Sequence, residues 1–152
     1  LIGKLKFSEE TTSLLRKAHQ QPQPRVAEGQ MLVQNGVKAA IDLSDGLIGD
    51  LGHICRMSRV GANIDIDKVP INPIVKDHFA NKALELALVG GEDYELLFTA
   101  KPDIIDKVRE LIATPITVIG EITREHAGKV LLLDANGNTI DFQKEGFNHF
   151  SR

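Results

Sequence analysis

The spacing of apolar residues alternates along the chain between the period of a helix and that of a strand. Apolar residues three or four positions apart predict amphipathic helices, and strict alternation predicts half-buried strands. Segments with helical spacing cover residues 9–20, 26–33, 47–59, 70–79, 83–88 and 102–113. Segments with strand character cover residues 38–43, 62–67, 94–100, 116–122, 129–133 and 139–142. This order, which ends in a hairpin, predicts an α+β domain with helices laid against a mostly antiparallel sheet.

Caps and helix breakers divide the chain near its start. Ser8 is followed by two glutamates, and its side chain is suited to cap the first helix because it can accept an unpaired N–H. Two prolines then restrict the residues before them, so residues 19–25 are predicted to form a stiff, extended connector. We therefore expect an N-terminal helix with its connector at residues 1–25 and a main domain at residues 26–152.

Composition narrows the functional classes. The chain has 152 residues, is 42% hydrophobic and has a net charge of −3, which fits one folded domain and not a basic nucleic-acid-binding or membrane-surface protein. No apolar run is long enough to span a bilayer, and no secretory signal is visible. Cys55 is the single cysteine, so an internal disulfide and a four-thiolate zinc site are excluded and a cytoplasmic location is expected. The first residue is Leu1, which allows the chain to be a fragment of a longer protein.

The first candidate for chemistry is the sequence IDLSDG at residues 41–46, between a predicted strand and a predicted helix. Asp42 and Asp45 are two carboxylates on one turn, and magnesium is often held by one or two carboxylates together with phosphate and water oxygens. The start of the following helix would add N–H groups that favour a phosphate. Spacing alone also allows a purely structural interpretation, in which Ser44 or Asp45 caps the helix and Asp42 is a solvated strand end.

The second candidate is GGEDYE at residues 90–95, where a helix stops and a strand begins. Paired glycines let the backbone turn sharply or approach a ligand closely. Three acidic residues are unusual at the head of a strand, and they could bind a cationic ligand or support a metal. The alternative is a helix C-cap followed by a solvated acidic turn.

The third candidate is the tail at residues 146–150, GFNHF, in a chain with few aromatic residues. Phe147 could stack on a flat or cationic ring, or the tail could simply be held on the core by its phenylalanines. Asp50 and His53 are interpreted as surface or supporting residues, and Cys55 as a buried, inert thiol. We find no nucleophile elbow, Walker-type loop or zinc spacing.

Together these motifs resemble the C-terminal domain of thiamine-monophosphate kinase. The resemblance is carried by AIDLSDGL at residues 40–47, by DLGHI at 50–54 and by ALVGGEDYEL at 87–96. The proline-containing connector and the tail at 146–150 also match, in the family's order. That family belongs to the superfamily of aminoimidazole-ribonucleotide synthetase, selenophosphate synthetase and the hydrogenase-maturation dehydratases. The resemblance therefore implies a layered α/β/α domain, with helices packed on a mostly antiparallel mixed sheet, like the C-terminal domain of aminoimidazole-ribonucleotide synthetase.

The resemblance also implies an activity and assigns residues to it. In the family, ATP donates its γ-phosphate directly to thiamine monophosphate, giving thiamine diphosphate, and no covalent nucleophile is needed. By resemblance, Asp42 and Asp45 are ligands of Mg²⁺ and Ser44 contacts ATP. Glu92 contacts the thiamine phosphate, and Phe147 packs against the ring system of thiamine.

The chain departs from the family in two respects. Phe147-Asn148 stands where the family often has Trp-Asp, so weaker stacking is expected. Family members also carry a preceding domain, which supplies further aspartates for Mg²⁺, most of the nucleotide site and the dimer interface. We therefore expect this chain to be the C-terminal half of a cytoplasmic homodimeric enzyme, folded but inactive by itself. Two alternatives are a related enzyme that acts on another small molecule through ATP, and a non-catalytic ligand-binding module.

Overall fold

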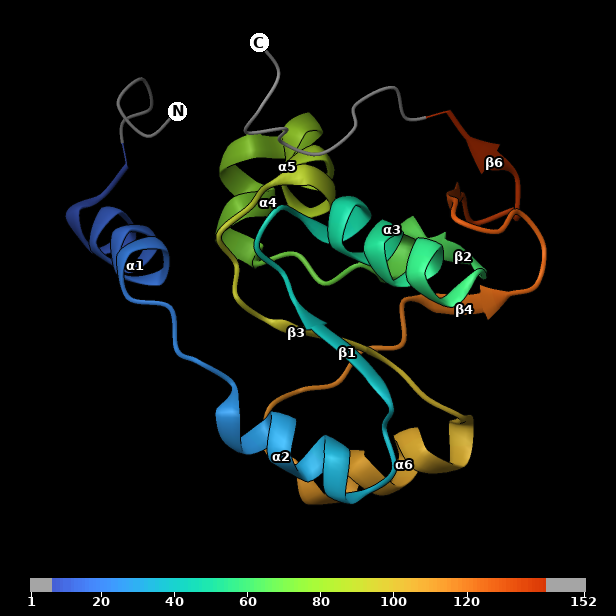
Figure 1. Ribbon diagram of the computed structural model, residues 1–152. Helices are drawn as coiled ribbons and strands as arrows, with labels where there is room; N and C mark the ends of the chain where they lie inside the picture. The colour runs from blue at the N-terminus through green and yellow to red at the C-terminus, as the bar shows by residue number, and fades with distance from the viewer. Residues whose placement is uncertain (1–6, 142–152) are drawn as a thin grey trace, which may run out of the picture.

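Six α-helices and six strands lie within residues 7–141, the part of the chain that the computed structural model describes (Figure 1). The helices are α1 (Glu9–Gln20), α2 (Val26–Gln34), α3 (Leu47–Ser58), α4 (Pro73–Phe79), α5 (Ala83–Val89) and α6 (Pro102–Leu111). The strands are β1 (Ala39–Asp42), β2 (Gly61–Asp65), β3 (Leu96–Thr99), β4 (Gly120–Thr123), β5 (Val130–Leu133) and β6 (Thr139–Ile140). Short 3₁₀ turns follow β2 at Ile66–Lys68 and α4 at Ala80–Lys82. Within the described residues, no helix is both long and apolar enough to cross a membrane.

The strands are divided between two sheets. β1 and β3 form an antiparallel pair in which Asp42, the last residue of β1, lies opposite Leu96, the first residue of β3. The other four strands are ordered β4-β2-β5-β6. In that sheet β2 runs parallel to β5, and the other neighbours are antiparallel. The predicted α+β class with mostly antiparallel, mixed pairing is confirmed, although the strands do not form one continuous sheet.

Two clusters of buried apolar residues hold these layers together. In the larger cluster, α3 and α5 pack on the four-stranded sheet through residues such as Leu51, Leu88 and Leu132. In the smaller cluster, α2 packs against α6 around Leu32 and Val108. The β1–β3 pair lies between α2 and α6 on one side and α3 and α5 on the other (Figure 1). Strand β3 is half-buried along its whole length, whereas Ala40 and Asp42 of β1 are exposed.

Strand β3 contributes side chains to both clusters because successive residues of a strand point to opposite faces. Leu97 packs against the larger cluster, whereas Leu96 and Phe98 pack against the smaller one. The position of the first residue of β3 is thus set by packing on two sides.

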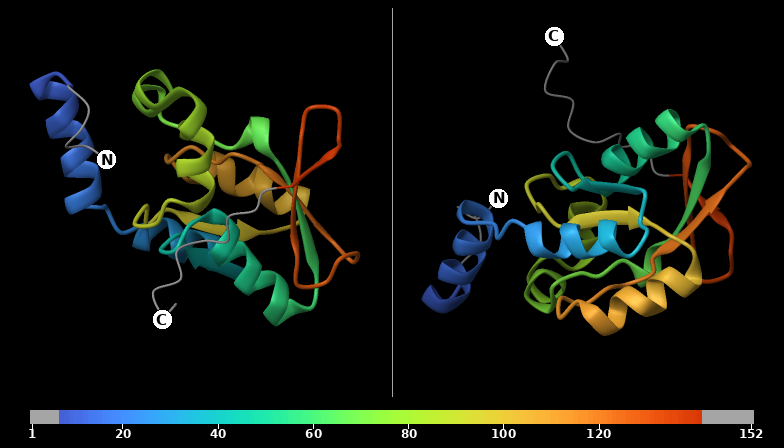
Figure 2. Two further views of the ribbon diagram at one scale, coloured as in Figure 1. Left: turned by 90° about the horizontal axis from the view of Figure 1, so that it is seen from above. Right: turned by 60° about the horizontal axis from the view of Figure 1, so that its bottom comes forward.

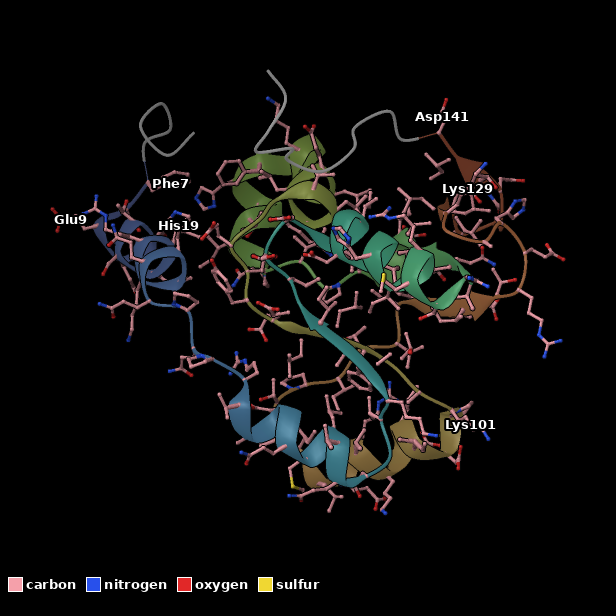
Figure 3. All side chains as sticks on the ribbon, in the orientation of Figure 1. Phe7, Glu9, His19, Lys101, Lys129 and Asp141 are labelled. Carbon is pink, nitrogen blue, oxygen red and sulfur yellow. The ribbon has the colours of Figure 1, made fainter. Side chains whose placement is uncertain are left out.

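Helix α1 stands apart from the rest of the molecule (Figures 1 and 2). It has no buried residue, and Leu14 is 45% exposed. At its start, Phe7 places its ring 5.0 Å from the ring of His78 and 6.0 Å from that of Phe79, both on α4 (Figure 3). As predicted, Ser8 caps the helix, and its hydroxyl oxygen accepts the N–H of Thr11 at 3.1 Å.

Some boundaries differ from the sequence-based prediction. His19 and Gln20, which fell in both the predicted helix and the predicted connector, are helical, because the nearest proline, Pro22, restricts only the residue before it. Residues 116–119 were predicted as strand but precede β4. The carbonyl of Ile116 accepts the Arg109 guanidinium of α6 at 3.3 and 3.4 Å, so this segment crosses from the smaller cluster before it pairs with β2.

Two substitutions on α3 test its orientation. Leu51 is 2% exposed and Met57 is 86% exposed. Leu51→Ala should lower the free energy of unfolding by about 2–5 kcal/mol, because it removes packed atoms and leaves a cavity. Met57→Ala should change it by no more than about 0.5 kcal/mol. Urea unfolding followed by circular dichroism measures both, and equal losses would contradict this orientation.

Candidate functional site

The two acidic motifs meet at one end of the β1–β3 pair. The first motif follows β1, and the second precedes β3. Antiparallel pairing places the end of one strand beside the start of its partner. Asp42 is therefore brought next to Leu96, and the loop at 43–46 next to the loop at 90–95. Segments about fifty positions apart in the sequence thus form one structural unit.

Backbone hydrogen bonds join the two loops beyond the strands. The Leu43 N–H donates to the Glu95 carbonyl at 2.9 Å, and the Tyr94 N–H donates to the Leu43 carbonyl at 2.8 Å. One step further, the Glu92 N–H donates to the Ser44 carbonyl at 3.0 Å. These three bonds fix the relative positions of the residues that were predicted to bind metal, nucleotide and substrate.

Glycines allow this close approach of the two loops. Gly46 has a φ of +105° and precedes α3, and a Cβ there would lie 2.9 Å from the carbonyl carbon of Val89. A Cβ on Gly91 would lie 2.5 Å from the carbonyl oxygen of Ser44. The paired-glycine motif was predicted to permit a sharp turn or a close approach to a ligand. In the structure, Gly91 approaches the backbone of the other motif.

One acidic side chain contacts the Tyr94 hydroxyl, and two others act on it electrostatically. This hydroxyl donates to Oε2 of Glu92 at 2.9 Å. That hydrogen bond raises the pKa of Tyr94, and the negative charges of Glu92, Asp42 and Asp45 raise it further. Glu92 and Tyr94 have φ values of 72° and 51°, a backbone region that is costly for side chains other than glycine and common in functional loops.

The carboxylates fit a magnesium–phosphate complex, but not a cage made by protein ligands alone. Asp42 is exposed and Asp45 is half-buried, so both can reach a ligand at the surface. Within residues 7–141, no group of three or more His, Cys, Asp or Glu side chains could hold a metal ion. Two carboxylates suit magnesium when phosphate and water oxygens complete the coordination.

Asp50 lies behind this loop and supports it, which was one of the two interpretations predicted for this residue. It is 2% exposed, so it is not a surface residue, whereas His53 is exposed as expected. Its Oδ2 accepts the N–H of Ser44 at 2.9 Å and the N–H of Asp45 at 3.0 Å. These two amides precede α3, and both are bonded to a carboxylate of the protein. The signal in the sequence was the position of Asp50, on the apolar face of α3.

The connector before α2 forms the other wall of the site. Arg25 makes two hydrogen bonds to the Glu95 carboxylate, Nε to Oε2 at 2.9 Å and Nη2 to Oε1 at 2.7 Å. A cleft of about 280 Å³ opens here, and it is lined by Pro24, Arg25, Val26, Asp42, Tyr94 and Leu96. The proline-containing connector is thereby tied to the second motif.

Asp93 and Phe147 are the remaining residues of interest in the motifs. Desolvation, and then the charge of Glu95, raise the pKa of Asp93 above its ordinary value. Phe147, the predicted stacking residue, lies outside the described residues. The roles of Asp42, Asp45, Ser44, Glu92 and Phe147 toward ligands stay predictions.

A substitution of Gly91 tests the contact between the loops. Gly91→Ala should lower the free energy of unfolding by about 1–3 kcal/mol, because the new methyl group would overlap the Ser44 carbonyl. Gly29 lies inside α2, where a Cβ would meet only the Leu96 side chain at 3.8 Å. Gly29→Ala should therefore be neutral or stabilising by up to about 1 kcal/mol. Thermal unfolding of both variants measures the difference, and a Gly91→Ala variant as stable as Gly29→Ala would contradict the contact.

Comparisons with known proteins identify relatives of this chain. The curated thiamine-monophosphate kinase of Buchnera aphidicola subsp. Schizaphis graminum is 46% identical over 140 residues, covering 90% of this chain and 42% of the relative. The thiamine-monophosphate kinase of Salmonella typhimurium is 40% identical over 157 residues, which cover 99% of this chain and 47% of the relative. The chain thus spans less than half the length of these relatives.

Solved structures give the same result. A thiamine-monophosphate kinase from Stenotrophomonas maltophilia K279a has a TM-score of 0.76 and 35% identity, covering 90% of this chain and 42% of that one. AaThiL complexed with AMPPCP and TMP has a TM-score of 0.74 and 27% identity, and the match covers 98% of this chain and 45% of that one. The resemblance to the C-terminal part of thiamine-monophosphate kinase is confirmed. Residues 4–132 also match the family model of the AIR synthase related protein, C-terminal domain, and the chain belongs to that family.

Proposed function

We propose that the protein containing this chain transfers the γ-phosphate of ATP to thiamine monophosphate, which yields thiamine diphosphate. The observation that carries the proposal is the pairing of the loops at 43–46 and 90–95 by backbone hydrogen bonds, since it unites the predicted metal, nucleotide and substrate residues. The similarity to thiamine-monophosphate kinases over most of the chain supports it. AMPPCP, an ATP analogue, and TMP in the complex of a structural relative support the choice of the two substrates.

In this proposal, Asp42 and Asp45 hold magnesium, which would neutralise charge on the transferred phosphoryl group when bound. Ser44 contacts ATP from the loop between them. Glu92 contacts thiamine monophosphate, with its carboxylate oriented by the Tyr94 hydroxyl. The protein's contribution is to position the two substrates in line, so no side chain needs to form a covalent intermediate. Phe147 would pack against the thiamine rings.

The local charge supports cationic ligands. None of the ion pairs within residues 7–141 involves Asp42, Asp45 or Glu92. The nearby Arg25 is occupied by Glu95, at 2.7 Å, and by Glu28, at 3.9 Å. Magnesium and the cationic thiazolium ring of thiamine would both be attracted to this edge, because its carboxylates have no positively charged partner among the described residues.

We further propose that this chain supplies only part of the active site. It covers 42–47% of the relatives, and its two candidate metal ligands leave room for others. The remaining aspartates, most of the nucleotide site and a homodimer interface would come from the rest of the complete gene product, which we expect in the cytoplasm. The isolated 152-residue chain is therefore expected to fold without producing thiamine diphosphate.

An assay of the complete gene product tests the activity. With ATP, magnesium and thiamine monophosphate, thiamine diphosphate and ADP should form in equal amounts, as measured by liquid chromatography. Turnover with another acceptor, but not with thiamine monophosphate, would favour a related enzyme of the superfamily. Failure to consume ATP with any acceptor would favour a ligand-binding module. Steady production of thiamine diphosphate by the 152-residue chain alone would contradict the proposal that this chain supplies only part of the active site.

Replacing the candidate metal ligands tests their role. Asp42→Asn or Asp45→Asn in the complete gene product should lower kcat by at least about a hundredfold, because the metal stabilises charge in the transition state. The midpoint of thermal unfolding should change little, since the two side chains are not buried. Asp103→Asn, an exposed change on α6, serves as the matched control. Unchanged turnover in both site variants would refute the metal assignment.

A further inference from the structure

Asp50 is the one buried charged residue within residues 7–141, at 2% exposure. A carboxylate is costly to bury unless hydrogen bonds replace its water. Asp50 obtains two such bonds from consecutive amides, the N–H groups of Ser44 and Asp45. Both amides belong to the loop that follows Asp42 and contains Asp45, the two candidate magnesium ligands.

The bonds hold a loop that has no other side-chain cap. Gly46, the residue before α3, has no side chain to bond the free amides, and Asp50 reaches back from the first turn of the helix instead. The peptide groups of Ser44 are thereby fixed on two sides. Its N–H is bonded to Asp50, and its carbonyl accepts the Glu92 N–H of the other motif at 3.0 Å.

We propose that Asp50 is a positioning residue for the metal site. By fixing the backbone of Ser44 and Asp45, it sets the distance and direction of the Asp45 carboxylate relative to Asp42. Such supporting contacts commonly change metal affinity or activity by about 10–100-fold when removed. This inference rests on the proposed function only in that magnesium and ATP are the ligands of the loop.

The test compares three variants of the complete gene product at a temperature below all of their unfolding midpoints. Asp50→Ala removes both hydrogen bonds. Asp50→Asn keeps an acceptor oxygen but loses the charge that strengthens such bonds. Leu51→Ala is the matched control, because the neighbouring side chain is equally buried but faces the larger apolar cluster. The probe is the magnesium complex of AMPPCP, and binding is measured by calorimetry without turnover.

Asp50→Ala should weaken binding of Mg–AMPPCP by about 10–100-fold, and Asp50→Asn by less. Amide hydrogen exchange at Ser44 and Asp45 should accelerate in the same order. Leu51→Ala should lower the unfolding midpoint without changing either measurement. Wild-type affinity in folded Asp50→Ala, or an equal loss of affinity in Leu51→Ala, would overturn the proposal.

Two outcomes separate this inference from the proposed function. If Asp50→Ala does not fold, the test relies on Asp50→Asn. Unchanged affinity for Mg–AMPPCP and unchanged amide exchange in that variant would then overturn the positioning role. If the wild type binds Mg–AMPPCP and responds to Asp50 as expected, but does not phosphorylate thiamine monophosphate, the positioning role stands. In that case only the proposal that thiamine monophosphate is the phosphoryl acceptor is refuted.

Discussion

The antiparallel pairing of β1 with β3 is the constraint on which the candidate site depends. Each strand is only four residues long, yet the ladder continues into the adjoining loops through the bonds of Leu43, Tyr94 and Glu92. Backbones can approach this closely only where side chains are absent, which explains Gly46 and Gly91. The geometry of the acidic residues therefore follows largely from main-chain bonding.

This short ladder would be weak by itself, because an isolated two-stranded pair is marginally stable in water. Its stability comes from the two apolar clusters on either side. Leu97 faces one cluster, and Leu96 and Phe98 face the other, so the strand is fixed in register and in direction. Arg25 adds a bidentate bond to Glu95 from the connector. The site is thus built on a rigid element, with its reactive groups on the loops that emerge from it.

Local signals in the sequence predicted most elements but not their partners. Ser8 as a cap and the helical spacing of α3 were confirmed, because caps and apolar periodicity depend on residues within one or two turns. The division of the strands into two sheets was not predicted, since pairing depends on distant residues. The union of the two motifs was implied only by a family resemblance. The partners of Asp50 were not predicted, because they are backbone amides, which are the same in every sequence.

The burial of Asp50 has an electrostatic consequence for the whole site. Backbone amides can offset negative charge, but the amides of Ser44 and Asp45, which precede α3, are bonded to Asp50. Asp42, Asp45 and Glu92 are thus left at an exposed edge, where water screens their repulsion. Any ligand or domain that covered this edge would remove that water and strengthen the repulsion unless it brought positive charge. A magnesium ion and a cationic substrate would meet this requirement, so closure of the site and binding of its ligands are expected to be energetically coupled.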